Sequence, residues 1–358
     1  MLRTGNSKNR FLGRLRMGVA GCGKVFEYYH LPALMKSPDW RVVSICDPLK
    51  QRRDWAQNRL TQVSMFESFP ALLQGSSLDA LLITTPPTTH CQLAIQALDM
   101  GLHVLVEKPM ALNTAESLLM LKASRRAKKH LWVSFNRRFK RPYLSLRDKL
   151  TAFPVDSIQS IRFELILNSH KWESITPYLG KDLQGGGVLD DVVTHQIDLL
   201  PWLIGEDVKA VKAEHIVEGE ARWEFVRYKL KFKNNLVAEC VAAHGPAYSE
   251  HLEIQLNDRR FIAYSSGVLE TRWMPTSLTR LYCVLGTFFH FALHKLTQAP
   301  NVTQDSIEKQ LRSFAATIRS EKGPFLAADT RSGVRSVETI QACRASLESG
   351  GGWRSLNS

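Results

Sequence analysis

The chain has 358 residues, of which 44% are hydrophobic and 23% charged, a composition that excludes a disordered protein. This length exceeds what one hydrophobic core usually serves, so we expect two domains. The net charge of +13 suits an anionic substrate or partner, but no helix-turn-helix or zinc-finger pattern accompanies it, and we expect no nucleic-acid binding.

Short β-branched runs alternate with helical patterns in residues 14–136, which follow a basic arm at 1–13 that lacks the apolar core of a secretory signal. This alternation predicts an α/β domain, in which a parallel sheet carries helices on both faces. Its strands are expected at 14–20, 41–46, 63–66, 80–85, 103–107 and 131–135. Its helices are expected at 25–36, in the stretch that ends at Leu60, and at 70–74, 88–100 and 113–130.

A different pattern occupies residues 137–350. Strand-like runs joined by polar turns such as KNN and NDRR predict a mostly antiparallel open sheet, and therefore an α+β second domain. The strands are expected at 161–167, 223–232, 236–244, 251–256 and 260–266. Helices are expected from the glycine run at 185–187 to about Trp202, and at about 304–321 and 333–349. The last residues, 351–358, are expected as a frayed tail.

Two features bear on the compartment in which the protein works. Six cysteines occur singly, without a CxxC pair, which argues against a zinc ribbon or a disulfide framework and favours free thiols in the reducing cytoplasm. The longest uncharged apolar run, at 281–293, has 13 residues and is too short to span a bilayer, so we expect no transmembrane segment.

The sequence GCGKVF lies where the first expected strand meets the first expected helix. Gly21 permits a tight turn there, and Gly23 lets backbone amides approach a pyrophosphate, which the positive end of the helix favours. The third small residue of such loops is replaced by Phe26. The loop therefore predicts a dinucleotide cofactor, and either the large ring points away from the strand or the first helix packs differently.

Asp47 closes the second expected strand. A carboxylate at this place accepts hydrogen bonds from both ribose hydroxyls of NAD and repels the 2′-phosphate of NADP. Its alternative role is to cap the next helix in front of Pro48. Because Lys50, Arg52 and Arg53 lie just beyond it, NADP stays open as a second cofactor.

Two polar segments, TTPPTTH at 84–90 and EKP at 107–109, end the fourth and fifth expected strands. Open α/β sheets bind ligands at the carboxyl ends of their strands, and prolines fix the backbone at this rim. Lys108 follows an apolar run, where it can hold a substrate hydroxyl and stabilise negative charge on its oxygen. Glu107 can hold the lysine or tune its pKa. The alternative is a surface Glu–Lys pair.

Five segments occur in one order along the chain: AGCGKVFEYYHLPAL, ITTPPTTH, HVLVEKPMAL, SFNRRF and GGGVLDDVVTHQIDLL. Together they resemble the glucose–fructose oxidoreductase / inositol dehydrogenase / MocA (Gfo/Idh/MocA) family, from about Arg16 to Gly350. The resemblance implies a Rossmann domain followed by an α/β domain whose open sheet often mediates dimers or tetramers. It also implies NAD(P)-dependent oxidation or reduction at a carbinol carbon, usually of a sugar, cyclitol or nucleotide sugar.

The resemblance also implies which residues form the site. Lys108 matches the lysine of the family's EKP motif, and Asp191 and His195 match the acid and the histidine of GGGxLxDxGxH, in which Val193 replaces a glycine. The expected cofactor contacts are Gly21, Gly23, Lys24, Val25, Asp47, Thr85, Pro86, His90, Glu107, Lys108 and Asn136. Lys108, Asp191 and His195 form the expected catalytic trio and also contact the substrate, together with Arg137, Lys171 and Trp172. The alternatives are a solvated basic loop for the two cationic residues and a core indole for the tryptophan.

A helix that begins near Val188 places Asp191 and His195 at i and i+4 on one face. The carboxylate can then hold the imidazole, which exchanges a proton with the reacting hydroxyl while Lys108 assists, although the two roles can be reversed. The alternatives are a structural Asp–His pair and a metal site, but no third ligand lies nearby and we expect no metal. Asp190 is expected to be a helix N-terminal carboxylate favoured by the helix dipole, and Asp198 an acid on the helix surface.

Three functions are compatible with these features. The first is an NAD-dependent oxidoreductase acting on a sugar or nucleotide sugar, for which the net charge suits an anionic substrate. The second is an NAD-dependent glycosidase, which the resemblance also covers. The third is a non-catalytic dinucleotide-binding regulator, which the presence of both Lys108 and His195 disfavours. We expect the first, in a cytoplasmic homodimer or homotetramer.

Overall fold

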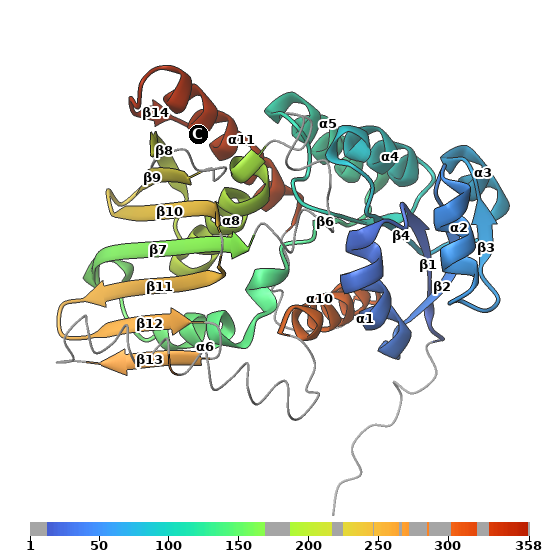
Figure 1. Ribbon diagram of the computed structural model, residues 1–358, viewed down its shortest axis with the longest axis horizontal. Coiled ribbons are helices and arrows are strands. Elements are labelled where there is room, and N and C mark those ends of the chain that lie inside the picture. The colour runs from blue at the N-terminus through green and yellow to red at the C-terminus, as the bar shows by residue number, and fades with distance from the viewer. Residues whose placement is uncertain are drawn as a thin grey trace, which may run out of the picture.

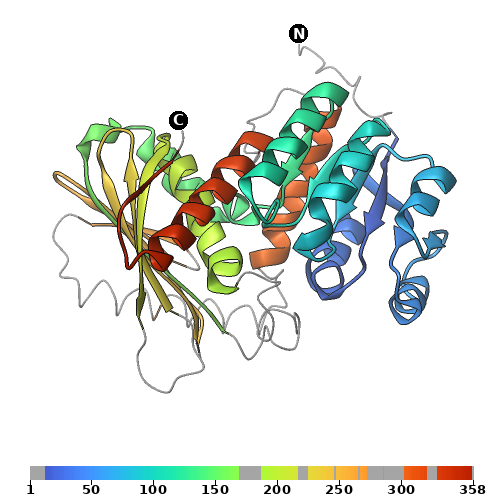
Figure 2. The same cartoon turned by 90° about the horizontal axis from the view of Figure 1, so that it is seen from above.

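The computed structural model describes residues 13–168, 187–216, 225–245, 247–264, 267–271, 285, 302–320 and 329–356. Two sheets stand at opposite ends of the molecule, and helices occupy the space between them (Figure 1, Figure 2). The basic arm, Lys171, Trp172 and almost all of the apolar run at 281–293 lie outside the described residues.

The first sheet has six strands, and all its neighbouring pairs are parallel (Figure 1). In spatial order they are β3 (Ser64–Phe66), β2 (Trp40–Cys46), β1 (Leu15–Ala20), β4 (Ala80–Ile83), β5 (His103–Val106) and β6 (Leu131–Val133). The helices of this part are η1 (Phe26–His30), α1 (Leu31–Lys36), α2 (Lys50–Gln57), α3 (Phe69–Gly75), α4 (Pro87–Asp99) and α5 (Thr114–Ala127). The predicted Rossmann arrangement is thereby confirmed.

The carboxyl ends of these parallel strands lie along one edge of the sheet. Strand β4 is buried at every residue and β5 at all but its first, as expected for a central strand covered on both faces. The glycine loop follows β1, the segment at 84–90 follows β4, and the EKP segment follows β5. The fold therefore brings all three segments to one rim.

The second sheet has eight strands and confirms the predicted mostly antiparallel pattern. In spatial order its strands are β13 (Gly267–Thr271), β12 (Arg260–Tyr264), β11 (Ser249–Leu256), β7 (Ile158–Asn168), β10 (Val237–Gly245), β9 (Phe225–Phe232), β8 (Val208–Ile216) and β14 (Arg354–Ser355). One pair of these described strands, β7 with β10, is parallel. The carboxyl ends of β7 and β10 consequently point to the same edge of the sheet.

Several elements of the second half have no counterpart among the expected ones, including β8, β13, β14 and the helix α6 (Arg141–Leu150). Strand β14 pairs antiparallel with Val211 and Ala210 of β8, so the expectation of a frayed tail is wrong for Arg354 and Ser355. A two-residue strand carries no periodic pattern, and its order comes from a neighbour that lies far away in the sequence.

Helices cover one face of the second sheet. Alternate residues of β9 and β11 are buried. They form one core with residues of four helices, α6, η5 (Leu189–Val193), α8 (Thr194–Ile204) and α11 (Thr330–Glu348). Val193, which stands where the family has glycine, is fully buried in this core. Its side chain therefore contributes to the packing of this core.

Helix α10 (Val302–Ile318) returns to the first sheet and lies between the two sheets together with α11 (Figure 2). Its Leu311 and Phe314 are buried in one cluster with Met17 and Trp40. The Trp40 ring stacks on Phe314 with centroids 5.6 Å apart, and its indole N–H donates to the Leu311 carbonyl at 2.8 Å. The domain boundary at residue 136 stays a prediction, but the core of the first sheet includes a helix from far beyond it.

A buried ion pair joins η2 (Asn136–Phe139) to α8. Arg138 donates from Nε and Nη2 to the two oxygens of Asp198 at 2.8 and 2.5 Å. The side chains are 6% and 1% exposed, so the prediction of a helix-surface acid at Asp198 is wrong. Helix α8 is buried on nearly all sides, and the periodicity of a helix that is apolar all round does not show which polar residue faces inward.

Asp198→Asn is expected to lower the free energy of unfolding by about 3–5 kcal/mol, because Arg138 loses the carboxylate that neutralises it inside the protein. Urea denaturation at neutral pH measures this change. The exposed pair of Arg335 with Asp207 provides the control, with side chains 58% and 25% exposed. Arg335→Met is expected to cost less than about 1 kcal/mol, and equal losses in both variants would contradict the argument.

Candidate active site

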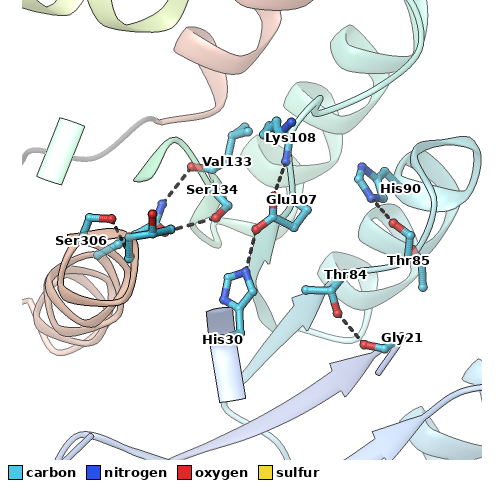
Figure 3. A network of polar contacts seen from close by, with 12 residues as sticks. Gly21, His30, Thr84, Thr85, His90, Glu107, Lys108, Val133, Ser134 and Ser306 are labelled. Atoms are coloured by element: carbon cyan, nitrogen blue, oxygen red, sulfur yellow. Dashed lines mark hydrogen bonds and ion pairs between the residues drawn. The ribbon is translucent and has the colours of Figure 1, made fainter. Parts of the chain in front are cut away.

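The glycine loop after β1 has a backbone that few residues other than glycine adopt. Gly21 has φ +85°, and a Cβ there would lie 2.9 Å from the Thr85 nitrogen and 3.0 Å from the Thr84 carbonyl carbon. The Gly21 amide donates to the Cys46 carbonyl at 2.8 Å, and the Thr84 hydroxyl donates to the Gly21 carbonyl at 2.5 Å (Figure 3). The loop is thus fixed against the ends of β2 and β4.

Gly23 tests whether the loop fits a dinucleotide. A Cβ added at Gly23 would meet no atom within 4 Å, so the backbone borders open space at the start of the first helix. Amide groups at a helix start attract phosphate oxygens. Lys24 and Val25 are partly exposed at this point, and the Lys24 ammonium lies 3.2 Å from Glu27. The residues present fit the pyrophosphate of a dinucleotide.

Phe26 replaces the third small residue of the loop and is fully buried. It lies in the core with Met17, Val19 and Phe314 of α10. The helix widens into a π-helical turn over η1 before α1 continues it. The Phe26 ring therefore lies in the core, at the point where the helix widens into the π-helical turn.

Asp47 connects the glycine loop to the end of β2. Its Oδ2 accepts from the Cys22 amide at 2.9 Å and its Oδ1 accepts from the Leu49 amide at 3.0 Å. Helix α2 begins at Lys50, with Leu49 as its N-cap and no side-chain cap, so the expected capping role of Asp47 is wrong. The carboxylate instead makes a turn at Leu49 and holds the loop, and Oδ1 keeps a further lone pair that can accept a ribose hydroxyl.

The cations beyond Asp47 have protein partners. Arg52 donates from Nε to the Cys22 carbonyl at 2.8 Å and from Nη2 to Glu27 at 3.0 Å. Arg53 donates to the backbone carbonyl of Asp47 at 2.7 Å. Both guanidinium groups thus support the backbone of the cofactor loop, a role that favours NAD over NADP.

His90 links the two polar segments at the rim. Its ring is fully buried, with Nε2 2.9 Å from the Thr85 carbonyl and Nδ1 2.9 Å from the Pro109 carbonyl. Burial lowers the pKa of His90. We infer that this side chain positions the Thr85 and Pro109 backbones, whereas the neighbouring Pro86 is exposed at the rim.

Glu107 anchors the backbone of Lys108 (Figure 3). Its Oε1 lies 2.6 Å from Nε2 of His30, which is fully buried in η1, and its Oε2 accepts from the Lys108 amide at 3.1 Å. Burial alone would raise the pKa of Glu107, but the hydrogen bond from His30 and the charge of Lys108 outweigh it and lower the pKa. An ionised Glu107 therefore holds the turn that carries Lys108.

Lys108 reaches from the first domain to Asp191 of the second. Its Nζ donates to Asp191 Oδ1 at 2.5 Å and to the Asp191 carbonyl at 3.1 Å. Asp191 Oδ2 faces His244 Nε2 at 2.9 Å. Burial raises the pKa of Asp191, but Lys108 and His244 lower it much more strongly, so the acid is ionised. The prediction of a surface Glu–Lys pair is wrong, because Lys108 pairs with a buried carboxylate.

The predicted pairing of Asp191 with His195 is also wrong. The chain forms a π-helical turn over η5, and among the described residues no hydrogen bond joins Asp191 to His195, whose Nδ1 has no partner. Asp191 turns toward Lys108 and His244. The neighbouring Asp190 accepts from Arg344 of α11, and burial raises the pKa of Asp190.

His195 is 9% exposed, and its Nδ1 is buried without a hydrogen-bond partner among the described residues. Burial lowers the pKa of His195 well below its usual range, and the charges of Arg137 and Lys108 lower it further, while Asp191 opposes them. The imidazole is therefore neutral at physiological pH. A neutral ring can accept a proton, as the predicted catalytic role requires.

Arg137 belongs to a buried polar cluster around Glu250. The carboxylate of Glu250 accepts hydrogen bonds from Arg137 and Tyr248, from Lys140 at 2.8 Å and from Tyr143 at 2.7 Å. The expected alternative of a solvated basic loop is wrong for Arg137, which is 6% exposed. Burial, with the charge of Arg137, lowers the pKa of Lys140 to about 8, against the opposing charge of Glu250. Asn136, at the start of η2, is partly exposed.

Three residues with defined roles here did not emerge from the sequence: His30, His244 and Glu250. His30 lies within the first quoted segment, AGCGKVFEYYHLPAL, four residues after Phe26. His244 lies in β10 and Glu250 in β11. Each is the one polar residue on the face of its strand that is otherwise apolar and buried. A lone polar residue in a buried row was the available signal.

Within the described part of the chain, no group of three His, Cys, Asp or Glu side chains is arranged to hold a metal ion. No described helix has the length and hydropathy needed to cross a membrane. The five described cysteines are free thiols.

Two family models match the chain. One is described as an oxidoreductase family with an NAD-binding Rossmann fold and matches residues 15–135. The other is described as the GFO/IDH/MocA C-terminal domain and matches residues 158–262. Together they cover more than half of the chain.

Individual proteins agree with this result. Oxidoreductase P35 of Formosa agariphila is 28% identical over 232 residues, which are 62% of this chain and 70% of that protein. Myo-inositol 2-dehydrogenase of Thermotoga maritima is 26% identical over 343 residues, which are 93% of this chain and 96% of that protein. The WlbA dehydrogenase of Bordetella pertussis, solved with NADH and UDP-GlcNAcA, has the same fold, with a TM-score of 0.78 and 20% identity over 96% of this chain and 98% of that one. This chain belongs to the Gfo/Idh/MocA family of oxidoreductases and has its NAD-binding Rossmann fold.

Proposed function

We propose that the protein transfers hydride between NAD and a carbinol carbon of a sugar, cyclitol or nucleotide sugar. One observation carries this proposal: Lys108 crosses from the rim of the Rossmann sheet to Asp191, 2.5 Å away, beside the neutral His195. An ammonium group and a neutral imidazole together can bind a hydroxyl group and remove its proton. Their position beside the glycine loop matches a reaction with the nicotinamide cofactor.

The cofactor, when bound, supplies the hydride acceptor or donor. We propose that its pyrophosphate lies over Gly21 and Gly23 and its adenosine ribose against Asp47. The other proposed contacts are Lys24, Val25, Thr85, Pro86, Glu107, Lys108 and Asn136, with His90 placing the Thr85 backbone. Glu107 acts from behind the lysine, since its carboxylate is bound to His30 and to the Lys108 amide.

Our proposed division of roles follows from the protonation states. His195 accepts the hydroxyl proton in the oxidation direction, because burial keeps its ring neutral. Lys108 donates a hydrogen bond to the same oxygen and stabilises the negative charge that develops there. Asp191 binds the ammonium group and aims it at the reaction site. The trio thus acts as a base, an electrostatic stabiliser and a positioning acid.

For the substrate we propose a sugar-like alcohol, with an anionic group favoured by the net charge of +13. The fold shared with WlbA, which was solved with a nucleotide sugar, supports this class, and the similarity to a myo-inositol dehydrogenase supports cyclitols. Arg137, which is bound to Glu250, stays a predicted substrate contact, as do Lys171 and Trp172 outside the described residues.

Nicotinamide absorbance, recorded with a panel of sugars, cyclitols and nucleotide sugars and with both NAD and NADP, tests the proposal. We expect turnover with NAD for at least one alcohol. A free sugar released without net NADH formation would instead support the NAD-dependent glycosidase, and dinucleotide binding without any turnover would support the regulator. A homo-oligomer in the cytoplasm also stays a proposal, and light scattering of the purified protein tests the assembly.

Asp47→Ser is expected to raise the Kd for NAD by about 10-fold or more, and that for NADP by less, since NADP gains relief from the repulsion of its 2′-phosphate. Fluorescence titration with each dinucleotide gives both constants. Asp54→Ser is the control, because Asp54 is exposed and pairs with Lys50 at 2.8 Å. An equal loss for both dinucleotides would remove the ribose role of Asp47.

A further inference from the structure

We infer that His244 is a positioning residue of the reaction, which orients Asp191 and through it the ammonium group of Lys108. This inference rests on the proposed function, in which Lys108 contacts the reacting oxygen. His244 is neither part of the expected trio nor a residue of the five family segments. Its place beside Asp191 comes from the fold.

The carboxylate of Asp191 lies between two donors. Lys108 Nζ is 2.5 Å from Oδ1, and His244 Nε2 is 2.9 Å from Oδ2. Because an ionised carboxylate only accepts hydrogen bonds, Nε2 of His244 carries the proton and donates it. The Asp191 side chain is 4% exposed and that of His244 is 15% exposed, so the histidine lies on the outer side of a buried acid.

Strand pairing explains why His244 meets this acid. β10 runs parallel to β7, with His244 opposite Leu167, so both strands end at the same edge of the sheet. The turn η5, which carries Asp191, packs against both strands. Residues 238, 240 and 242 of β10 point into the helix-covered core, and the two-residue period puts His244 at the end of this row. A polar ring thus occupies the last position of an apolar row, next to η5.

The arrangement fixes one rotamer of Asp191. With Oδ2 held by His244, Oδ1 faces Lys108, which also donates to the Asp191 carbonyl at 3.1 Å. Without His244, the carboxylate can turn about its side-chain bonds and carry the ammonium away from the reacting oxygen. A displacement of about 1 Å at such a group costs on the order of 100-fold in rate. The acid would also lose one of the two donors that lower its pKa.

His244→Leu and His244→Gln test this inference. We expect kcat to fall about 10- to 100-fold in His244→Leu, with the KM for NAD unchanged, because the nicotinamide site itself is intact. Glutamine has an amide N–H₂ group that can donate to Asp191, so His244→Gln is expected to recover most of the rate. His251→Leu is the matched control: His251 is a partly exposed histidine of the same sheet, 3.8 Å from Glu253, and its loss is expected to leave kcat unchanged.

A second measurement does not depend on turnover. The rate of reductive methylation of Lys108, followed by peptide mass spectrometry relative to the exposed Lys36, reports how firmly Asp191 holds the ammonium. The ratio is expected to rise in His244→Leu and to stay near the wild-type value in His244→Gln. The inference would be overturned if His244→Leu left both the methylation ratio and kcat unchanged. It would also be overturned if His244→Leu and His244→Gln lost kcat equally. Wild-type protein without NAD-linked turnover, but with the expected change in methylation, would refute the proposed function alone.

Discussion

Lys108→Met is expected to abolish turnover of the alcohol substrate with NAD while the dinucleotide still binds. Methionine keeps an unbranched apolar stem but removes the charge that stabilises the developing oxyanion, and it leaves Asp191 with His244 as its remaining side-chain donor. We expect kcat to fall by about 10²–10⁴-fold. The rate is measured from the absorbance of NADH as it forms, and the Kd for NAD is measured by fluorescence titration.

Lys149→Met is the control for this variant. Lys149 is a lysine of α6 that pairs with Glu270 at 3.4 Å, and its side chain is 40% exposed. We expect it to retain wild-type kcat. A Lys108→Met protein with wild-type turnover would remove Lys108 from the mechanism, and one that has lost NAD binding would show that its main role is to hold the cofactor.

His195→Asn is the second variant with a large expected effect. Asparagine can still form hydrogen bonds but cannot accept a proton, so kcat for alcohol oxidation should fall by about 10²–10⁴-fold. The loss should be smaller at high pH, where hydroxide in the solvent replaces part of the missing base. If the KM for the alcohol instead rises by a similar factor at every pH while kcat is unchanged, His195 is a binding residue.

The pH profile of the wild-type enzyme follows from the same histidine. Burial lowers the pKa of His195 below the usual 6.5 of imidazole. The ring therefore stays deprotonated, and able to accept a proton, at pH values at which an exposed histidine would already be charged. We expect the acid limb of kcat for oxidation to lie below pH 6.5. A limb at or above 6.5 would mean that the base is another group.

The parallel sheet was predictable because short, largely apolar strands alternate with helices along the chain. The glycine loop, EKP and the GGGVLDDVVTH segment were predictable as sites because polar or strained residues stand at the ends of such runs. The glycine loop and EKP meet at one rim because parallel strands share their polarity, whereas Asp191 of the GGGVLDDVVTH segment meets Lys108 through tertiary packing.

The errors have a common physical origin. The pairing of Asp191 with His195 was inferred from helical spacing alone, whereas Asp191 is held by Lys108 and His244, which come from other elements. The partners Asp198–Arg138, Arg137–Glu250 and Asp191–His244 join residues 53 to 113 positions apart. Such pairs depend on tertiary packing, which periodicity along a single chain does not encode.

Helix α10 determines how this protein can be divided. Because Trp40 stacks on Phe314 and donates to the Leu311 carbonyl, the cofactor-binding half is complete only when residues 302–318 are present. A fragment that stops at residue 136 would expose this apolar surface to water and should aggregate. A chimera can join the eight-stranded sheet to the nicotinamide-binding domain of another protein. The regions equivalent to residues 1–136 and to helix α10 must then both come from that same protein.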